Sequence, residues 1–216
     1  MKCFNTTILI IVSILSLSGC SFFSQEARSY ILGNKNAKTS WIYLSGLTQT
    51  IDSEQETHNR KLLDAIGKEL NIRIIAVPSQ FRCEYFDNKL CWPHETAQET
   101  TKTYNYILSY ADTPIDGYIG FSNGGFFLHE LMQLYPVKQH IITIGATGTV
   151  HKDSQIKAKS VTIIIGKKDE YHYTYALDFS EQLENVNVPV TVIEHDEGHI
   201  IPQNILEQAL INLRQP

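Results

Sequence analysis

A serine flanked by two glycines is the first feature that points to chemistry. Gly120-Phe121-Ser122-Asn123-Gly124 follows an apolar stretch, Gly117–Phe121, that we expect to be a strand, and it opens a stretch of helical periodicity. A strand–turn–helix of this kind exposes a serine hydroxyl on a sharp, strained turn, and small residues at Gly120 and Gly124 leave room for the neighbouring strand and helix. The pattern predicts a nucleophile elbow centred on Ser122; the alternative is a glycine-rich turn with a surface serine.

A serine hydroxyl is a weak nucleophile unless a base and an orienting acid activate it. Asp169 stands just beyond the expected strand Val161–Ile165, and His199 lies in the loop after the expected strand Val190–Glu194. Each group therefore occupies a loop at the carboxyl end of a strand, and the chain order is serine, acid, histidine. This arrangement predicts acyl transfer by a serine nucleophile.

Other titratable residues lie near these positions. Glu170 is the alternative acid and His195 the alternative base, although His195 sits at the strand end and not in the following loop. We assign no catalytic role to three further histidines, namely His94, His151 and His172.

The expected elements alternate between apolar runs of four to six residues and stretches of helical period. The expected strands are Trp41–Leu44, Ile72–Val77, Gly117–Phe121, His140–Ile144, Val161–Ile165 and Val190–Glu194, with a further short strand near 30–32. The expected helices are about Glu56–Leu70, Thr96–Tyr110, Asn123–Tyr135, Tyr173–Leu183 and Pro202–Leu213. Continuous apolar strands, each followed by a helix, predict an α/β domain with a mostly parallel sheet of six to seven strands and helices on both faces.

Three stretches together resemble the α/β-hydrolase superfamily, particularly its small carboxylesterase, phospholipase and dienelactone-hydrolase-like members. They are GFSNGG at 120–125, GKKDE at 166–170 and EGHIIP at 197–202. The resemblance extends from about Trp41 to the C-terminus and implies the three-layer α/β-hydrolase fold. It also implies that Ser122 attacks an acyl carbon, that His199 transfers the proton and that Asp169 orients the imidazole.

The resemblance further implies an oxyanion hole made of backbone N–H groups. One donor is expected from Asn123, at the start of a helix. The second comes from the loop after the first strand of the set, where many members read His-Gly and this chain reads Leu44-Ser45-Gly46-Leu47. We expect Leu47 N–H to serve, with Gly46 as the alternative.

The first twenty residues have the composition of an export signal. A positive start and about a dozen mainly apolar residues lead to Leu17-Ser18-Gly19-Cys20, a sequence that resembles the bacterial lipobox. The apolar run is too short to span a bilayer. We expect a signal peptide at 1–19, a lipid-anchored Cys20, a tether at 20–39 and a hydrolase domain at 40–216. A plain secretory peptide is the alternative, and Ser21 favours the outer membrane where the cell has one.

Two cysteines remain in the expected domain, Cys83 and Cys91. In an oxidising compartment a disulfide is the favoured interpretation; two reduced thiols, or a metal site with His94, are the alternatives. Both cysteines lie in residues 78–94, a long stretch without a clear element that would be either a lid and substrate wall or a structural flap.

Composition narrows the classes of function. The net charge is −5 and no run is rich in lysine or arginine, which argues against a nucleic-acid partner. We expect no metal or other cofactor, and a small-molecule or lipid ester as substrate. Amidase or peptidase chemistry on the same residues, and a non-catalytic envelope lipoprotein that uses the fold for binding, are the alternatives.

Overall fold

The computed structural model describes residues 29–215. The expected signal peptide at 1–19 and the expected lipidation site Cys20 lie outside these residues. Between residues 29 and 215 there is no helix with the length and apolar character needed to cross a membrane.

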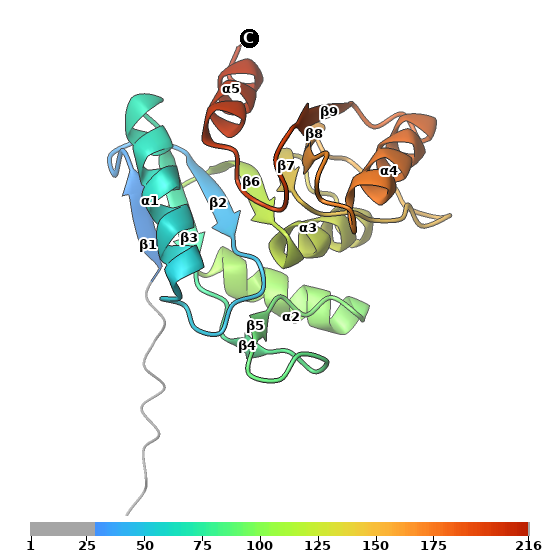
Figure 1. The fold of residues 1–216 in the computed structure, drawn as a ribbon, viewed down its shortest axis with the longest axis horizontal. Coiled ribbons are helices and arrows are strands. Elements are labelled where there is room, and N and C mark those ends of the chain that lie inside the picture. The colour runs from blue at the N-terminus through green and yellow to red at the C-terminus, as the bar shows by residue number, and fades with distance from the viewer. Residues whose placement is uncertain (1–28, 216) are drawn as a thin grey trace, which may run out of the picture.

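A seven-stranded sheet forms the centre of the molecule (Figure 1). Its strands are β1 (Tyr30–Gly33), β2 (Ser40–Leu44), β3 (Arg73–Val77), β6 (Ile115–Phe121), β7 (His140–Ile144), β8 (Ser160–Gly166) and β9 (Val190–His195). The spatial order is β1-β3-β2-β6-β7-β8-β9, and all neighbours pair in parallel except β1, which runs antiparallel to β3. The six main strands expected from the sequence are all present, so the prediction of a mostly parallel α/β sheet is confirmed.

Five helices cover the two faces of the sheet (Figure 1). They are α1 (Glu54–Glu69), α2 (Ala97–Leu108), α3 (Asn123–Leu134), α4 (Tyr173–Asn185) and α5 (Gln203–Leu213). Apolar residues of α2, α3 and α4 share one buried cluster, and those of α1 and α5 share the other. Alternate residues of β2 divide between the clusters, Ile42 and Leu44 in the first, Trp41 and Tyr43 in the second, as the period of a strand requires. The three-layer arrangement is therefore confirmed.

The folded domain begins at the edge strand β1, earlier in the chain than expected. Tyr30 pairs with Ala76 and Gly33 pairs with Arg73. The sheet thus starts upstream of residue 40, where the sequence placed the start of the domain, and takes in part of the expected tether. Because β1 is antiparallel, its first residue lies at the carboxyl ends of the parallel strands.

The stretch 78–94 carries a small hairpin of β4 (Phe81–Arg82) and β5 (Leu90–Cys91). Cys83 and Cys91 form a disulfide, as the sequence indicated. The side chains of Tyr85 and Phe86 lie exposed at the tip of the hairpin. This segment follows β3, so it lies beyond the carboxyl end of the sheet, the edge where the functional loops of such folds are found.

Candidate active site

Ser122 occupies the tight turn between β6 and α3. Its backbone has φ 50° and ψ −118°, a conformation that residues other than glycine rarely adopt. Its N–H donates to Ile144 O at 2.8 Å, and its carbonyl oxygen accepts from Gly125 N at 2.8 Å and from Phe126 N at 3.1 Å. The strained turn is therefore held from β7 on one side and from the first turn of α3 on the other.

The two glycines that flank Ser122 allow the chain to fold closely on itself. A Cβ at Gly120 would stand 2.6 Å from Gly124 O, and one at Gly124 would stand 2.4 Å from Leu44 O. Both separations are far below van der Waals contact with rigid backbone. Any side chain at either position would push α3 away from the sheet and disturb the turn.

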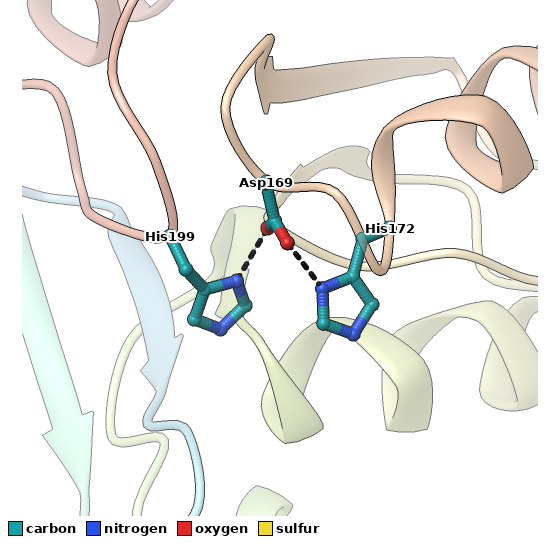
Figure 2. Close-up of side chains that lie close together, drawn as sticks. All are labelled: Asp169, His172 and His199. Atoms are coloured by element: carbon teal, nitrogen blue, oxygen red, sulfur yellow. Dashed lines mark hydrogen bonds and ion pairs between the residues drawn. The ribbon is translucent and has the colours of Figure 1, made fainter.

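Asp169 and His199 are in direct contact, although 30 positions separate them in the chain (Figure 2). Nδ1 of His199 lies 2.5 Å from Oδ2 of Asp169. The Asp169 side chain is buried, whereas 34% of the His199 side chain is exposed. A buried acid that holds one ring nitrogen leaves the other nitrogen of the imidazole available to a neighbouring group.

His172 also belongs to this cluster, although no role was expected for it from the sequence. Its Nδ1 lies 2.8 Å from Oδ1 of Asp169, so the two oxygens of one carboxylate each meet an imidazole (Figure 2). Its backbone N–H also bonds to Asp169 O at 3.0 Å, and it is the residue that precedes α4. The available signal was its position three residues after the acid, because one turn at a helix start brings residues i and i+3 together.

The charge of Asp169 is maintained despite its burial. Burial raises the pKa of this carboxyl, but hydrogen bonds from His199 and His172 outweigh that effect, and the net pKa lies below the ordinary value. Asp169 is therefore ionised at neutral pH and can stabilise positive charge on His199.

Neither alternative residue occupies this position. Glu170 is exposed. His195 is buried at the end of β9, its Nδ1 has no hydrogen-bond partner among the described residues, and burial lowers its pKa. His151 pairs with Glu130 instead, and His94 Nδ1 lies 2.7 Å from Trp92 O.

The loop that carries His199 lies beside the nucleophile elbow and the end of β7. The ring of Phe121, the residue before Ser122, lies 5.1 Å from the His199 ring between centroids. A Cβ at Gly145, the residue after the carbonyl that holds Ser122, would stand 2.8 Å from the same imidazole. The elbow and the histidine loop are thus neighbours at the carboxyl ends of β6 and β7.

The loop after β2 lies on the other side of the elbow. A Cβ at Gly46 would stand 3.1 Å from Cβ of Ser122 and 3.2 Å from the Phe121 ring. Leu47 follows directly and is 36% exposed. The backbone of this loop therefore passes close to Ser122, beside the N-terminus of α3 where Asn123 begins the helix.

Trp92 connects the loop after β2 with the start of α3. The side chain is fully buried; its indole N–H donates to Ser45 O at 2.9 Å, and its backbone N–H donates to Asn123 Oδ1 at 2.7 Å. Leu90, two residues earlier, pairs with Thr48 through both backbone groups. The base of the 78–94 segment is therefore fastened to the loop after β2 and to the start of α3, which favours the structural flap over a lid at this end.

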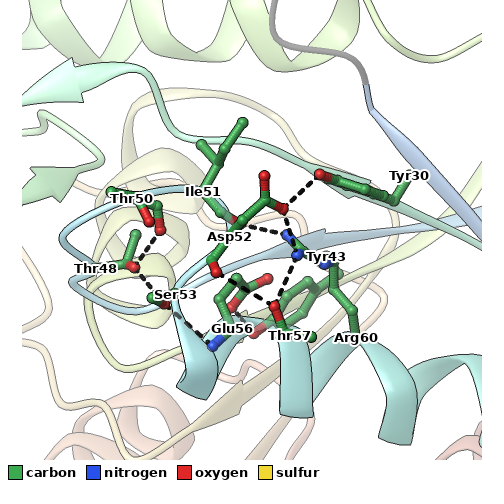
Figure 3. A network of polar contacts seen from close by, with 10 residues as sticks. All are labelled: Tyr30, Tyr43, Thr48, Thr50, Ile51, Asp52, Ser53, Glu56, Thr57 and Arg60. Carbon is green, nitrogen blue, oxygen red and sulfur yellow. Dashed lines mark hydrogen bonds and ion pairs between the residues drawn. The ribbon is translucent and has the colours of Figure 1, made fainter.

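A polar network holds the loop after β2 against helix α1 and strand β1 (Figure 3). Arg60 of α1 donates to Ile51 O at 2.5 Å and to Asp52 Oδ1 at 2.9 Å, and Tyr30 OH donates to that same oxygen at 2.7 Å. The Arg60 guanidinium also lies 4.0 Å above the Tyr30 ring. Edge strand β1 and helix α1 thus hold the loop that passes Ser122.

A buried carboxyl completes the network. Glu56 Oε2 accepts from Tyr43 OH at 3.1 Å, and the Glu56 side chain is almost fully enclosed. Burial raises the pKa of Glu56 to about 7, against the lowering effect of Arg60. Glu56 is therefore partly protonated at neutral pH.

Comparison with known proteins gives fold and family. A family model described as "Serine hydrolase (FSH1)" matches residues 14–209. No curated protein matches the chain.

Solved structures with the same fold include two carboxylesterases and a thioesterase. A carboxylesterase from Mesorhizobium loti is 17% identical, with 85% of this chain and 93% of that chain covered and a TM-score of 0.64. The Bacillus cereus carboxylesterase is 16% identical, with 88% and 94% covered and a TM-score of 0.62. Zea mays acyl-protein thioesterase 2 is 17% identical, with 87% and 99% covered and a TM-score of 0.57. With the family model spanning most of its length and an α/β-hydrolase sheet at its centre, this chain belongs to the FSH1 serine hydrolase family.

Proposed function

We propose that this protein is an exported carboxylesterase that cleaves carboxylic esters or thioesters through an acyl-serine intermediate on Ser122. The observation that carries the proposal is the hydrogen bond between Asp169 and His199, at the sheet edge where Ser122 stands on a strained turn. Family membership supports hydrolysis by a serine, and solved structures of the same fold named as carboxylesterases and a thioesterase support esters as the substrate class.

The reaction uses three side chains in two steps. His199 Nε2 takes the proton of the Ser122 hydroxyl as Oγ bonds to the acyl carbon, and the same proton passes to the leaving alcohol or thiol as the ester bond breaks. A water molecule then gives a proton to His199 as its oxygen bonds to the acyl carbon. His199 returns that proton to Ser122 Oγ as the bond between serine and the acyl group breaks and the acid leaves. Throughout, the ionised Asp169 holds Nδ1–H and stabilises the imidazolium.

The negative oxygen of each tetrahedral intermediate is bound by backbone N–H groups. One is Asn123 N–H at the start of α3, where the helix dipole also favours negative charge. The other is Leu47 N–H, or Gly46 N–H, from the loop that passes Ser122. Trp92 keeps the two sides at a fixed separation, because it is bonded to Ser45 and to Asn123 at once.

Labelling with a fluorophosphonate probe tests this proposal. Wild-type protein is expected to be labelled, and Ser122→Ala to abolish the label. Ser109→Ala, a change at a serine on the end of α2, serves as the control that keeps it. A label that survives Ser122→Ala would overturn the assignment. Equal or better cleavage of peptide amides than of p-nitrophenyl esters would favour the amidase alternative.

We also propose that lipid on Cys20 anchors the enzyme to the bacterial cell envelope, at the outer membrane where one exists. The lipobox-like Leu17-Ser18-Gly19-Cys20 supports the anchor. Tyr30 pairs with Ala76 near the carboxyl end of β3, so the chain enters the fold at the edge that carries the candidate site. This geometry supports substrates close to the membrane, such as lipid esters.

A further inference from the structure

We propose that Asp169, His172 and His199 together bind a zinc-like divalent cation, and that this cation switches the hydrolase off reversibly. One ligand atom from each of the three residues lies within 4.8 Å of the others. The two imidazole rings stand beside each other, with centroids 5.0 Å apart and planes inclined by 31°. The inhibition rests on the proposed function, whereas the binding does not.

The donor set suits zinc. Two imidazole nitrogens and one carboxylate oxygen are the ligands of many catalytic zinc sites, which leave a fourth position to water. Bonds in such sites are about 2.0–2.2 Å long, and both Nδ1 atoms already lie within 2.8 Å of a carboxylate oxygen. Small rotations of the two rings therefore bring the donors around one ion.

Charge and access are also favourable. Asp169 is buried and each of its two carboxylate oxygens faces one imidazole, so a cation held there would meet an acidic oxygen and two nitrogen donors. The cluster is accessible from solvent through the two histidines, because 26% of the His172 side chain and 34% of the His199 side chain are exposed.

Inhibition follows from the tautomer of His199. A neutral imidazole carries one ring proton, and in the catalytic arrangement that proton is on Nδ1, so that Nε2 can accept the proton of Ser122. A cation bonded to Nδ1 uses the lone pair of that nitrogen, and the ring proton moves to Nε2 through solvent. The ring remains neutral, but Nε2 now carries a proton and cannot act as the base. His199 can therefore act as the base or bind the cation, but not both at once.

Another histidine–carboxylate pair in the protein provides a matched comparison. His151 Nε2 lies 3.4 Å from Glu130, and half of the His151 side chain is exposed. This pair is not in a group of three potential ligands within the described residues. His151→Asn is therefore the control for His172→Asn.

Calorimetric titration of ZnCl2 into Ser122→Ala tests binding without any catalytic readout, because serine is not one of the ligands. We expect one saturable site that is at least tenfold weaker when His172→Asn is added and unchanged when His151→Asn is added. The proposal would be overturned if no saturable binding were found, or if His172→Asn left the affinity unchanged.

Because a variant can fail to fold, the zinc-loaded Ser122→Ala protein is also examined by X-ray absorption at the zinc edge. Two imidazoles and an oxygen ligand support the site, and sulfur ligation overturns it.

Hydrolysis of a p-nitrophenyl ester tests the switch. ZnCl2 is expected to inhibit the wild type, a chelator to restore the rate, and His172→Asn to require at least tenfold more zinc relative to its own zinc-free rate. Zinc binding without inhibition would overturn the switch. Absence of esterase activity in zinc-free protein would instead contradict the proposed function and leave the binding result standing.

Discussion

Asn123, the residue after the candidate nucleophile, accepts a hydrogen bond at 2.7 Å from the backbone N–H of Trp92. Trp92 is fully buried and its indole is bonded to Ser45, so the start of α3 and the loop after β2 share one rigid support. Donors that are fixed before the reaction cost no reorganisation when negative charge develops, and this is what an oxyanion hole requires.

Loss of that support is expected to slow catalysis. Asn123→Ala removes the acceptor of the Trp92 N–H, which we expect to lower the free energy of unfolding by about 1–3 kcal/mol. It should also lower kcat about tenfold with a smaller change in KM, because the misplaced N–H acts mainly on the transition state. Steady-state kinetics and urea unfolding measure both effects. Asn204→Ala, in the first turn of α5, is the control, and a wild-type kcat in Asn123→Ala would argue against the support.

A paired substitution identifies the acid of the proposed triad. Asp169→Asn keeps the shape of the side chain but no longer favours the Nδ1–H tautomer of His199, so kcat should fall roughly 10³–10⁴-fold. Glu170→Gln should leave kcat within about twofold, because Glu170 is exposed. Hydrolysis of p-nitrophenyl acetate by the two variants distinguishes them. The opposite ranking would make Glu170 the acid.

Glu56 should make stability depend on pH. Burial raises the pKa of its carboxyl from 4.5 to about 7, so the folded protein holds this proton more tightly than the unfolded chain does. The contribution of Glu56 to stability is therefore fully present below about pH 4.5 and is lost as the pH rises through about 7. The loss is of order 3 kcal/mol.

Glu56→Gln mimics the protonated form and removes this dependence. We expect the variant to be more stable than the wild type at pH 8 and similar to it at pH 5, as measured by urea unfolding at the two values. Glu54→Gln, an exposed position two residues earlier on α1, should retain the wild-type difference. If Glu56→Gln also keeps that difference, another group is responsible for it.

Membrane attachment is tested at the cysteines of the N-terminal segment. Cys20→Ser should move the protein from the membrane fraction to the soluble fraction, because the acyl chains would have no thiol to join. Cys3→Ser should leave it in the membrane, since Cys3 belongs to the segment that we propose is removed as a signal peptide. Cell fractionation followed by immunoblotting measures both. A Cys20→Ser protein that stays in the membrane would contradict lipidation.

The order of elements and the chemistry-bearing loops could be predicted from the sequence because both depend on local patterns. Strands buried on both faces need continuous apolar runs, such as His140–Ile144, which has the same bounds in the structure. Helix α2 begins after a capping box, with Thr96 and Glu99 bonded reciprocally, and that signal is also local. Parallel strands then bring their carboxyl-end loops to one edge, so Ser122, Asp169 and His199 could be placed near one another.

The tertiary structure decided which partners those residues have. The spacing of three residues between Asp169 and His172 allows a contact, but the folded turn before α4 is what brings the two side chains together. Trp92 and Asn123 are 31 positions apart in the chain, and nothing in that spacing indicates their hydrogen bond. The burial of Glu56 depends on packing of α1 against the sheet and on the contact with Tyr43 of β2. Sequence periodicity reports which side of an element faces the core, whereas hydrogen bonds between distant side chains depend on where the packed elements bring them.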